Sequence, residues 1–454
     1  MRELGVGDTI CAIATPPGHG GIGVVRISGA DARRVLASVW RGRVAVSDFE
    51  PRRLYLGDVG VDRVMAVFMP APATYTGEDV VELSAHGSPA VLRQIMEGCL
   101  ASGARAAGPG EFTRRAFVAG KLDLAQAEGV ADLINATSER AARLAGEQLK
   151  GALSEKVSDA GDALATLRAE IEAGIDFPEE NLEQRAMGDV IDRLQDIASN
   201  LKILSSTYAG GRLIREGARV AIVGRPNAGK SSIFNRLAGA DRAIVHHEPG
   251  TTRDVVEEQI SLGGLSFRLR DTAGLRANAG EIEAIGVGRA REEIAAADIV
   301  VAVFDGSRAW DGEDAELMAT LDPRRCIAVI NKCDLTLAFD PEKLPVLSGG
   351  IKPLHLSART GSGIEYLASQ LVGCAAADAG KAEGVMVASA RHKALIDEAL
   401  LAIDAAQNSL EKGEPAECAA ARMLAAQDAL GSITGRVTTD DILDRIFSTF
   451  CIGK

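Results

Sequence analysis

Hydrophobic and polar positions change their spacing several times along the chain, and each spacing predicts a different structure. Short apolar runs at 22–27 and 64–68 are typical of strands, and turns rich in Gly and Pro separate them. The stretch 90–100 has the spacing of a helix. We therefore expect an α+β module over residues 1–120.

The next segment, residues 121–216, is predicted to be helical. It is rich in Ala, Leu, Glu and Arg, and its apolar residues recur at helical spacing, as at Leu153, Val157, Ala160, Leu164 and Leu167. This pattern indicates two or three long helices with a break at 176–178.

Residues 217–378 alternate strand-like and helical runs, which is typical of a parallel-sheet α/β domain. Helical spacing returns over 379–454. Because no clear stop signals mark the two joins, we predict one helical domain, 121–216 with 379–454, into which the α/β domain is inserted. Two independent helical modules are the alternative. The predicted fold class is multidomain α/β.

One loop in the α/β segment carries a phosphate-binding motif. Residues 224–231 read G-R-P-N-A-G-K-S, after a buried strand at 220–223 and before a helix. Gly224 and Gly229 let backbone N–H groups turn toward phosphate oxygens, and the helix directs its positive end at them. Lys230 supplies a charge for the β/γ-phosphates, and the Ser231 hydroxyl can ligate Mg²⁺.

Further motifs in the same order identify the nucleotide as GTP or GDP. The carboxylate of Asp334, in N-K-C-D, can accept two N–H donors that guanine has and adenine lacks. Thr252, in G-T-T-R-D, is expected to complete the Mg²⁺ shell. The expected nucleotide contacts are Asn227, Ala228, Gly229, Lys230, Ser231, Ser232, His246, His247, Glu248, Pro249, Gly250, Thr251, Thr252, Asp271, Thr272, Ala273, Gly274, Asn331, Lys332, Asp334, Ser357, Ala358 and Arg359.

The position after D-T-A-G departs from many GTPases. There a Gln orients the attacking water, whereas this chain has Leu275, which cannot. Asn227 resembles GTPases that recruit a K⁺ ion near the β/γ bridge. Glu281 or Glu283 is a candidate for orienting the water; the alternative is that both lie on a solvated helix start.

Composition narrows the class of protein. The net charge of −13 argues against nonspecific nucleic-acid binding over the whole surface. Arg33-Arg34, Arg52-Arg53 and Arg114-Arg115 form either a local phosphate-binding face or solvated surface arginines. Seven scattered cysteines without a C-x-x-C pair indicate a reduced, cytoplasmic protein, and we expect no signal peptide and no membrane span.

Nearly the whole chain resembles the MnmE (TrmE) family of tRNA-modifying GTPases. The resemblance rests on A-T-P-P-G at 14–18, G-K-L-D-L-A-Q-A-E at 120–128, the nucleotide motifs and the terminal F-C-I-G-K. It implies that the N-terminal module binds a methylene- or 5-formyl-tetrahydrofolate and forms a homodimer. Its folate-contacting positions correspond to Arg26, Glu82, Lys121 and Lys454.

The resemblance also implies partners and further roles. A FAD- and NADH-dependent partner, MnmG (GidA), would join the chain in a heterotetramer-type complex and modify carbon 5 of the wobble uridine of certain tRNAs. Glu283 matches the water-orienting carboxylate of the family, and Arg276, a further catalytic candidate, follows D-T-A-G-L as the family pattern expects. The K⁺ ligands would be Asn227, His246, Glu248 and Thr251, although the residues at 246 and 248 depart from those expected.

Two questions stay open at this point. Cys451 is either a nucleophile near the folate carbon or a buried apolar side chain beside Phe450. The alternative function is a GTPase switch in ribosome assembly, although no basic RNA-binding module follows the α/β segment. A GTP-gated membrane transporter domain is excluded by the missing membrane span.

Overall fold

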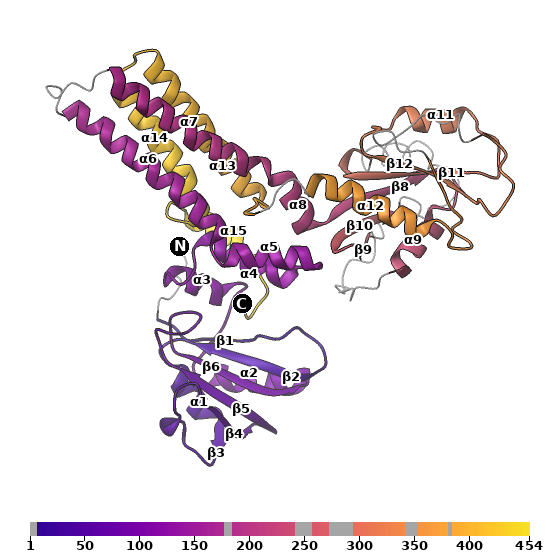
Figure 1. The fold of residues 1–454 in the computed structure, drawn as a ribbon. Helices are drawn as coiled ribbons and strands as arrows, with labels where there is room; N and C mark the ends of the chain where they lie inside the picture. Colours follow the sequence, from indigo (N-terminus) through magenta and orange to yellow (C-terminus); the bar gives the residue numbers. More distant parts are fainter. Residues whose placement is uncertain (1–6, 177–183, 241–256, 272–293, 341–352, 380–383) are drawn as a thin grey trace. The chain divides into compact units, whose positions relative to one another are not determined.

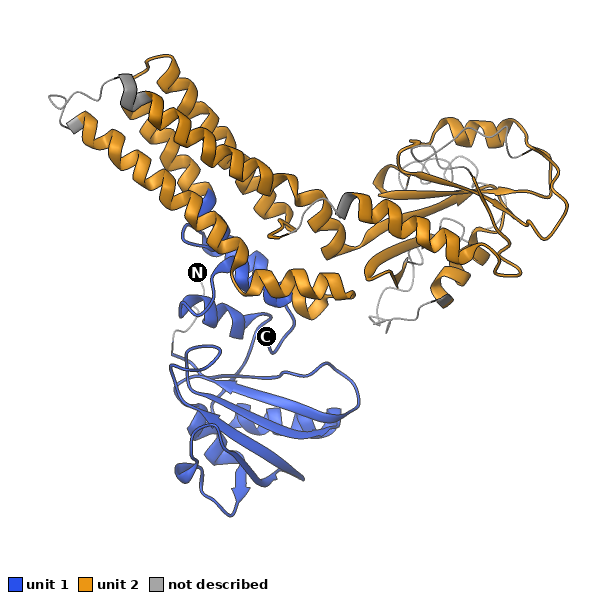
Figure 2. Cartoon of the chain, viewed as in Figure 1, with its two compact units in different colours: residues 1–131, 430–454 blue, residues 132–429 orange. Residues whose placement is uncertain are grey.

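The computed structural model describes residues 7–176, 184–240, 257–271, 294–340, 353–379 and 384–454. The chain divides into two compact units, Met1–Ala131 with Leu430–Lys454 and Asp132–Ala429 (Figure 2). They are called unit 1 and unit 2 below. The predicted fold class is confirmed, whereas the exact domain boundaries stay a prediction.

Unit 1 contains a seven-stranded, mostly antiparallel sheet in the order β3-β4-β5-β6-β2-β1-β7 (Figure 1). Helices α1 and α2 cover one of its faces. The elements are β1 Ile10–Ile13, β2 Gly20–Ser28, α1 Ala32–Val39, β3 Trp40–Gly42, η1 Val46–Asp48, β4 Leu54–Val59, β5 Asp62–Met69, β6 Val80–Gly87, α2 Pro89–Ala101, β7 Arg105–Ala106, α3 Glu111–Val118, α4 Leu124–Asn135, which continues into unit 2, and α15 Asp440–Phe447.

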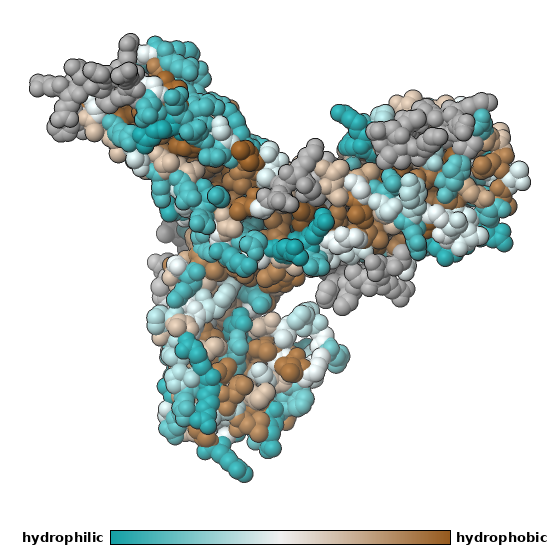
Figure 3. All heavy atoms as spheres, in the orientation of Figure 1, coloured by the Kyte–Doolittle hydropathy of each residue, from teal (hydrophilic) through white to brown (hydrophobic). Residues whose placement is uncertain are grey.

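Alternation along β2 explains how this sheet has one buried and one open face. Val25 and Ile27 point into the core, whereas Arg26 between them points to the other face. On that open face Leu54, Leu56 and Met65 are exposed, and brown spheres lie over the sheet of unit 1 in Figure 3. The predicted strands at 22–27 and 64–68 and the helix at 90–100 are confirmed as β2, β5 and α2.

Unit 2 contains the long helices and a six-stranded sheet in the order β13-β12-β11-β8-β10-β9. All neighbouring strands of this sheet are parallel except β9 and β10. The elements are α5 Glu139–Leu149, α6 Ala152–Asp176, α7 Gln184–Ser206, α8 Tyr208–Glu216, β8 Ala218–Gly224, α9 Lys230–Ala240, β9 Glu257–Leu262, β10 Leu265–Asp271, β11 Ile299–Asp305, α11 Gly312–Ala319, β12 Cys326–Asn331, β13 Leu354–His355, α12 Ile364–Ala379, α13 Ala390–Glu411 and α14 Ala416–Thr434, which continues into unit 1.

Burial follows the patterns read from the sequence. Strand β8 is buried on both faces, with Val220 and Ile222 packing with α9 and α12, and Ala221 and Val223 packing with α11. In α6 the predicted stripe is buried at every position except the half-buried Ala160. Helix α6 ends at Asp176, where the break was predicted.

Candidate functional site

The phosphate-binding motif forms the loop between β8 and α9. Three of its residues have positive φ: Gly224 at 150°, Asn227 at 63° and Gly229 at 98°. A Cβ on Gly224 would lie 2.3 Å from the carbonyl oxygen of Val303, and one on Gly229 would lie 2.1 Å from Nδ2 of Asn331. Because both positions lack room for a side chain, the loop requires glycine there for steric as well as conformational reasons.

Lys230 begins α9 and its side chain lies back over this loop. Its Nζ donates to the carbonyl oxygens of Gly224 at 2.7 Å and Arg225 at 2.8 Å. The residue is buried, so its charge is concentrated at the loop beside the N-terminus of α9. This arrangement suits a polyanion such as the phosphates of a nucleotide.

Asn331, the last residue of β12, connects the phosphate loop to a second loop at 357–359. Its Nδ2 donates to the carbonyl oxygen of Ala228 at 2.8 Å, and its Oδ1 accepts from the N–H of Ala358 at 3.0 Å. Asn331 is only 2% exposed, so both bonds are shielded from water. One buried amide therefore sets the spacing between the two loops.

Asp334 lies beside that second loop. Its Oδ1 accepts a hydrogen bond from the hydroxyl of Ser357 at 2.6 Å, and Nη1 of Arg359 lies 3.9 Å from Oδ2. The Ser357 hydroxyl holds the pKa of Asp334 below its ordinary value. Asp334 is thus an ionised acceptor with capacity for further N–H donors. Lys332 is anchored separately, because its Nζ donates to Asp305 at 2.6 Å.

Several expected site residues lie outside the described residues: His246, His247, Glu248, Pro249, Gly250, Thr251, Thr252, Thr272, Ala273, Gly274, Leu275, Arg276, Glu281 and Glu283. Asp271 ends β10 next to β8, whereas Ser231 and Ser232 are exposed in the first turn of α9. Within the described ranges no group of three or more His, Cys, Asp and Glu is arranged to hold a metal ion.

A second cluster lies on the open face of the sheet in unit 1. Arg26 and Glu82 are directly opposite in the β2–β6 ladder, and Nη2 of Arg26 lies 2.8 Å from Oε1 of Glu82. Arg26 also donates to the carbonyl oxygen of Gly453 at 3.4 Å and lies over the ring of Phe112. The cluster therefore joins two strands, α3 and the end of the chain.

The C-terminal tail is fixed mainly through its backbone. The carbonyl oxygens of Cys451 and Lys454 accept from the N–H groups of Gly110 and Phe112. Cys451 itself is exposed, so of the two alternatives the one that buries it beside Phe450 does not hold; the ring of Phe450 enters the core. Lys121 is exposed in the loop after α3.

The paired arginines of unit 1 all have partners within the chain. Arg34, Arg53, Arg114 and Arg115 contact carboxylates, and Arg33 and Arg52 donate to backbone carbonyl groups. These contacts favour the alternative that the arginines are ordinary surface and structural residues. They argue against a shared phosphate-binding face.

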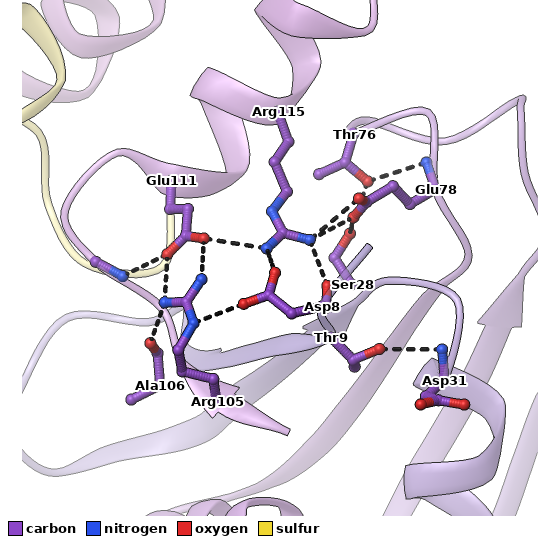
Figure 4. Close-up of polar contacts among 11 residues, drawn as sticks. Asp8, Thr9, Ser28, Asp31, Thr76, Glu78, Arg105, Ala106, Glu111 and Arg115 are labelled. Atoms are coloured by element: carbon purple, nitrogen blue, oxygen red, sulfur yellow. Dashed lines mark hydrogen bonds and ion pairs between the residues drawn. The ribbon is translucent and has the colours of Figure 1, made fainter. Parts of the chain in front are cut away.

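Arg115 belongs to an ion network that the sequence did not reveal (Figure 4). Arg105 and Arg115 both donate to Glu111, at 2.6 and 3.1 Å, and both contact Asp8; Arg115 also reaches Glu78. Burial favours a higher pKa for Glu111, but its hydrogen bonds from Arg105, the N–H of Gly108 and Arg115 outweigh it, so the net pKa is lowered.

We expect Glu111→Gln to destabilise unit 1 by about 1–3 kcal/mol at pH 7, because two cations lose a buried carboxylate. A lowered folded-state pKa gives stability that is present above the unfolded value, 4.5, and is lost as pH falls through the folded pKa. The difference from wild type should therefore shrink as the pH falls below 4.5. Urea unfolding would be followed by the fluorescence of Trp40 in a Trp310→Phe background.

The matched control is Glu50→Gln, which removes an exposed carboxylate that pairs with Arg53. It should change stability by less than about 0.5 kcal/mol. Equal unfolding midpoints for Glu111→Gln and its background at pH 7 would show that the network contributes nothing net.

Comparison with known proteins places the whole chain in one group. Residues 9–121 match the profile "GTP-binding protein TrmE N-terminus", and residues 124–451 match "MnmE helical domain". A protein from Syntrophus aciditrophicus named "tRNA modification GTPase MnmE" is 42% identical over 455 residues, covering 98% of this chain and 99% of the relative. Proteins of the same name from Koribacter versatilis and Azoarcus sp. are 41% and 45% identical, covering 99% and 98% of this chain and 100% and 98% of those proteins. None of the described helices is long and apolar enough to cross a membrane.

Proposed function

This chain belongs to the MnmE family of tRNA modification GTPases, and from that premise we propose that it hydrolyses GTP while modifying the wobble uridine of certain tRNAs. The observation that most directly supports GTP binding and hydrolysis is the pair of hydrogen bonds made by the Asn331 side chain. They hold the phosphate loop at a fixed distance from the loop at 357–359. Asp334 lies at that second loop as an ionised acceptor, as recognition of guanine requires. The family match over both ends of the chain supports tRNA modification over ribosome assembly.

In this proposal two cations accompany the nucleotide. The hydroxyl groups of Ser231 and Thr252 are hard oxygen donors and suit Mg²⁺, which would neutralise charge on the β/γ-phosphates. Asn227, His246, Glu248 and Thr251 would hold K⁺, and Asn227 is exposed in the phosphate loop, where a ligand can reach it. Glu283 would orient the attacking water, and Arg276, which precedes it in the same segment, is a further catalytic candidate.

For the modification itself, we assign a reduced folate to the cluster on unit 1. Glu82 fits a pterin edge because Arg26 engages only its Oε1, and no donor in the described part of the chain contacts its Oε2. Arg26, Lys121 and Lys454 bring cationic groups for the glutamyl carboxylates. When bound, the folate would supply the one-carbon unit, and the exposed Cys451 is the candidate nucleophile from this chain.

The proposal includes two protein partners. A second copy of the chain would cover apolar residues on the open face of the unit 1 sheet, where Leu54, Leu56 and Met65 are exposed. The FAD- and NADH-dependent MnmG (GidA) would complete a heterotetramer-type complex that acts on tRNA in the cytoplasm.

The most direct test is mass spectrometry of wobble uridines from cells that lack this protein. Loss of the modified nucleoside, restored by the intact gene, supports the proposal, and an unchanged nucleoside profile contradicts it.

The proposed role of K⁺ is tested separately. GTP turnover of the purified protein is compared in KCl and NaCl at equal ionic strength. Equal rates in the two salts would remove K⁺ from the mechanism.

We expect Glu82→Ala to weaken binding of 5-formyl-tetrahydrofolate and to abolish tRNA modification, while GTP hydrolysis persists. The pterin donors would lose their acceptor, at a cost of roughly 1–3 kcal/mol, or about 5–150-fold in affinity. Calorimetry on the full chain measures the affinity, and phosphate release measures hydrolysis.

The control for this experiment is Asp58→Ala, which removes an exposed strand carboxylate that pairs with Arg63 in the same sheet. It should bind the folate like wild type. Equal affinities for wild type and Glu82→Ala would place the pterin away from Glu82.

A further inference from the structure

Arg236 on α9 makes contacts that none of the nucleotide motifs accounts for. Its Nε donates to the carbonyl oxygen of Ala358 at 3.0 Å, and its Nη2 donates to that of Arg359 at 2.6 Å. Helix α9 begins at Lys230 in the phosphate loop. A side chain from the helix that follows the phosphate loop therefore holds the backbone of the loop at 357–359, 122 residues further along the chain.

The contact fixes the direction of one peptide group. In a trans peptide the C=O and the following N–H point in opposite directions. The carbonyl of Ala358 points toward Arg236, so the N–H of Arg359, in the same peptide plane, points away from it. Within the described part of the chain, no acceptor takes this N–H.

The neighbouring groups of the loop are already engaged. The N–H of Ala358 donates to Asn331. The N–H groups of Thr360 and Gly361 donate to the hydroxyl and the carbonyl oxygen of Ser357, respectively. The N–H of Arg359 is thus the donor that the loop presents to a ligand. A planar guanidinium bonded at two points restrains both the position and the tilt of the peptide that carries it.

We propose that Arg236 is a positioning residue for base recognition, which directs the N–H of Arg359 at the carbonyl oxygen on carbon 6 of guanine. The inference rests on the proposed function, because it presupposes a guanine nucleotide in this domain. Adenine carries an amino donor at the same carbon and would meet the N–H with a second donor, so Arg236 adds selectivity for guanine.

The test measures the affinity of the full-length protein for three nucleotides. GDP has the carbonyl oxygen, 6-thio-GDP replaces it with sulfur, a weaker acceptor, and IDP keeps it but lacks the amino group expected to face Asp334. We expect Arg236→Ala to weaken GDP binding about tenfold. The GDP to 6-thio-GDP preference should fall by a similar factor, and the GDP to IDP preference should stay within about twofold of wild type.

Two further variants separate positioning from a general loss of structure. Arg236→Lys keeps the charge but cannot bond both carbonyls in one plane, so it should restore only part of the preference for GDP over 6-thio-GDP. Arg324→Ala removes an arginine whose side chain is 87% exposed and should match wild type with all three nucleotides. Arg236 is itself exposed, and its removal leaves the core unchanged.

Each outcome decides between the two proposals. Wild-type protein that binds no guanine nucleotide would overturn the proposed function. Wild-type protein that binds GDP, with Arg236→Ala either unchanged or weakened equally for all three nucleotides, would overturn the positioning role alone. A wild-type protein without preference for GDP over 6-thio-GDP would also overturn it, since the oxygen would not be read.

Discussion

Glu283→Ala is expected to lower GTP turnover by about 10²–10⁴-fold while GTP affinity stays close to that of wild type. Leu275 occupies the position from which many GTPases orient the attacking water, and an apolar side chain cannot do so. A carboxylate that positions water acts in the transition state, so its loss affects the rate far more than ground-state binding. Single-turnover hydrolysis in KCl and nucleotide titration measure the two quantities separately.

Glu281→Ala is the matched control, because it removes the same functional group two residues earlier. It should keep wild-type turnover. Wild-type turnover in Glu283→Ala together with slow turnover in Glu281→Ala would transfer the role to Glu281. Loss of GTP affinity in Glu283→Ala would instead indicate a structural role.

The strand, the glycine-containing loop and the helix of the phosphate-binding motif could be predicted from the sequence because the motif is one short stretch with fixed spacing. The structure adds the steric reason for Gly224 and Gly229: their backbones approach Val303 and Asn331, which are distant in sequence, too closely for a side chain. The strand before the loop and the helix after it likewise follow from continuous apolar runs and helical spacing.

Contacts between distant parts of the chain could not be derived in this way. Arg26 reaches the carbonyl of Gly453, 427 residues away, and β2 by itself indicates only an outward-facing arginine. The grouping of Arg26 and Glu82 was therefore expected only from the family resemblance. Arg236 gave no signal either, because an arginine on the open face of a helix has the pattern of a solvated residue.

Glu111 shows a different limit of sequence reasoning. An acidic residue at the start of α3 is explained by the helix dipole alone, and nothing local indicates that two arginines converge on it. The network depends on where β7 and the N-terminal segment lie in three dimensions. The same contacts favour a structural role for Arg115 over a phosphate-binding one, since Arg115 faces carboxylates within the chain.

Asp334→Asn is expected to shift the preference for GTP over xanthosine triphosphate by roughly two to four orders of magnitude. The carboxylate of Asp334 can accept only, and its bond from Ser357 keeps its pKa low, so it stays ionised at neutral pH. Guanine presents two N–H donors to such an acceptor. Xanthine replaces the amino donor with a carbonyl acceptor, which an amide at position 334 can meet with its own N–H.

Asp334→Ala provides the control, since it removes the acceptor without adding a donor. It should lose GTP affinity without gaining affinity for xanthosine triphosphate. Asp334→Asn should lose affinity for GTP and gain affinity for xanthosine triphosphate. Competition titrations with the two triphosphates on full-length protein measure the ratio directly. If Asp334→Asn kept the wild-type preference for GTP, the base would have to be read by other groups, and the geometry that joins Asp334, Ser357 and Asn331 would serve only to stabilise the loops.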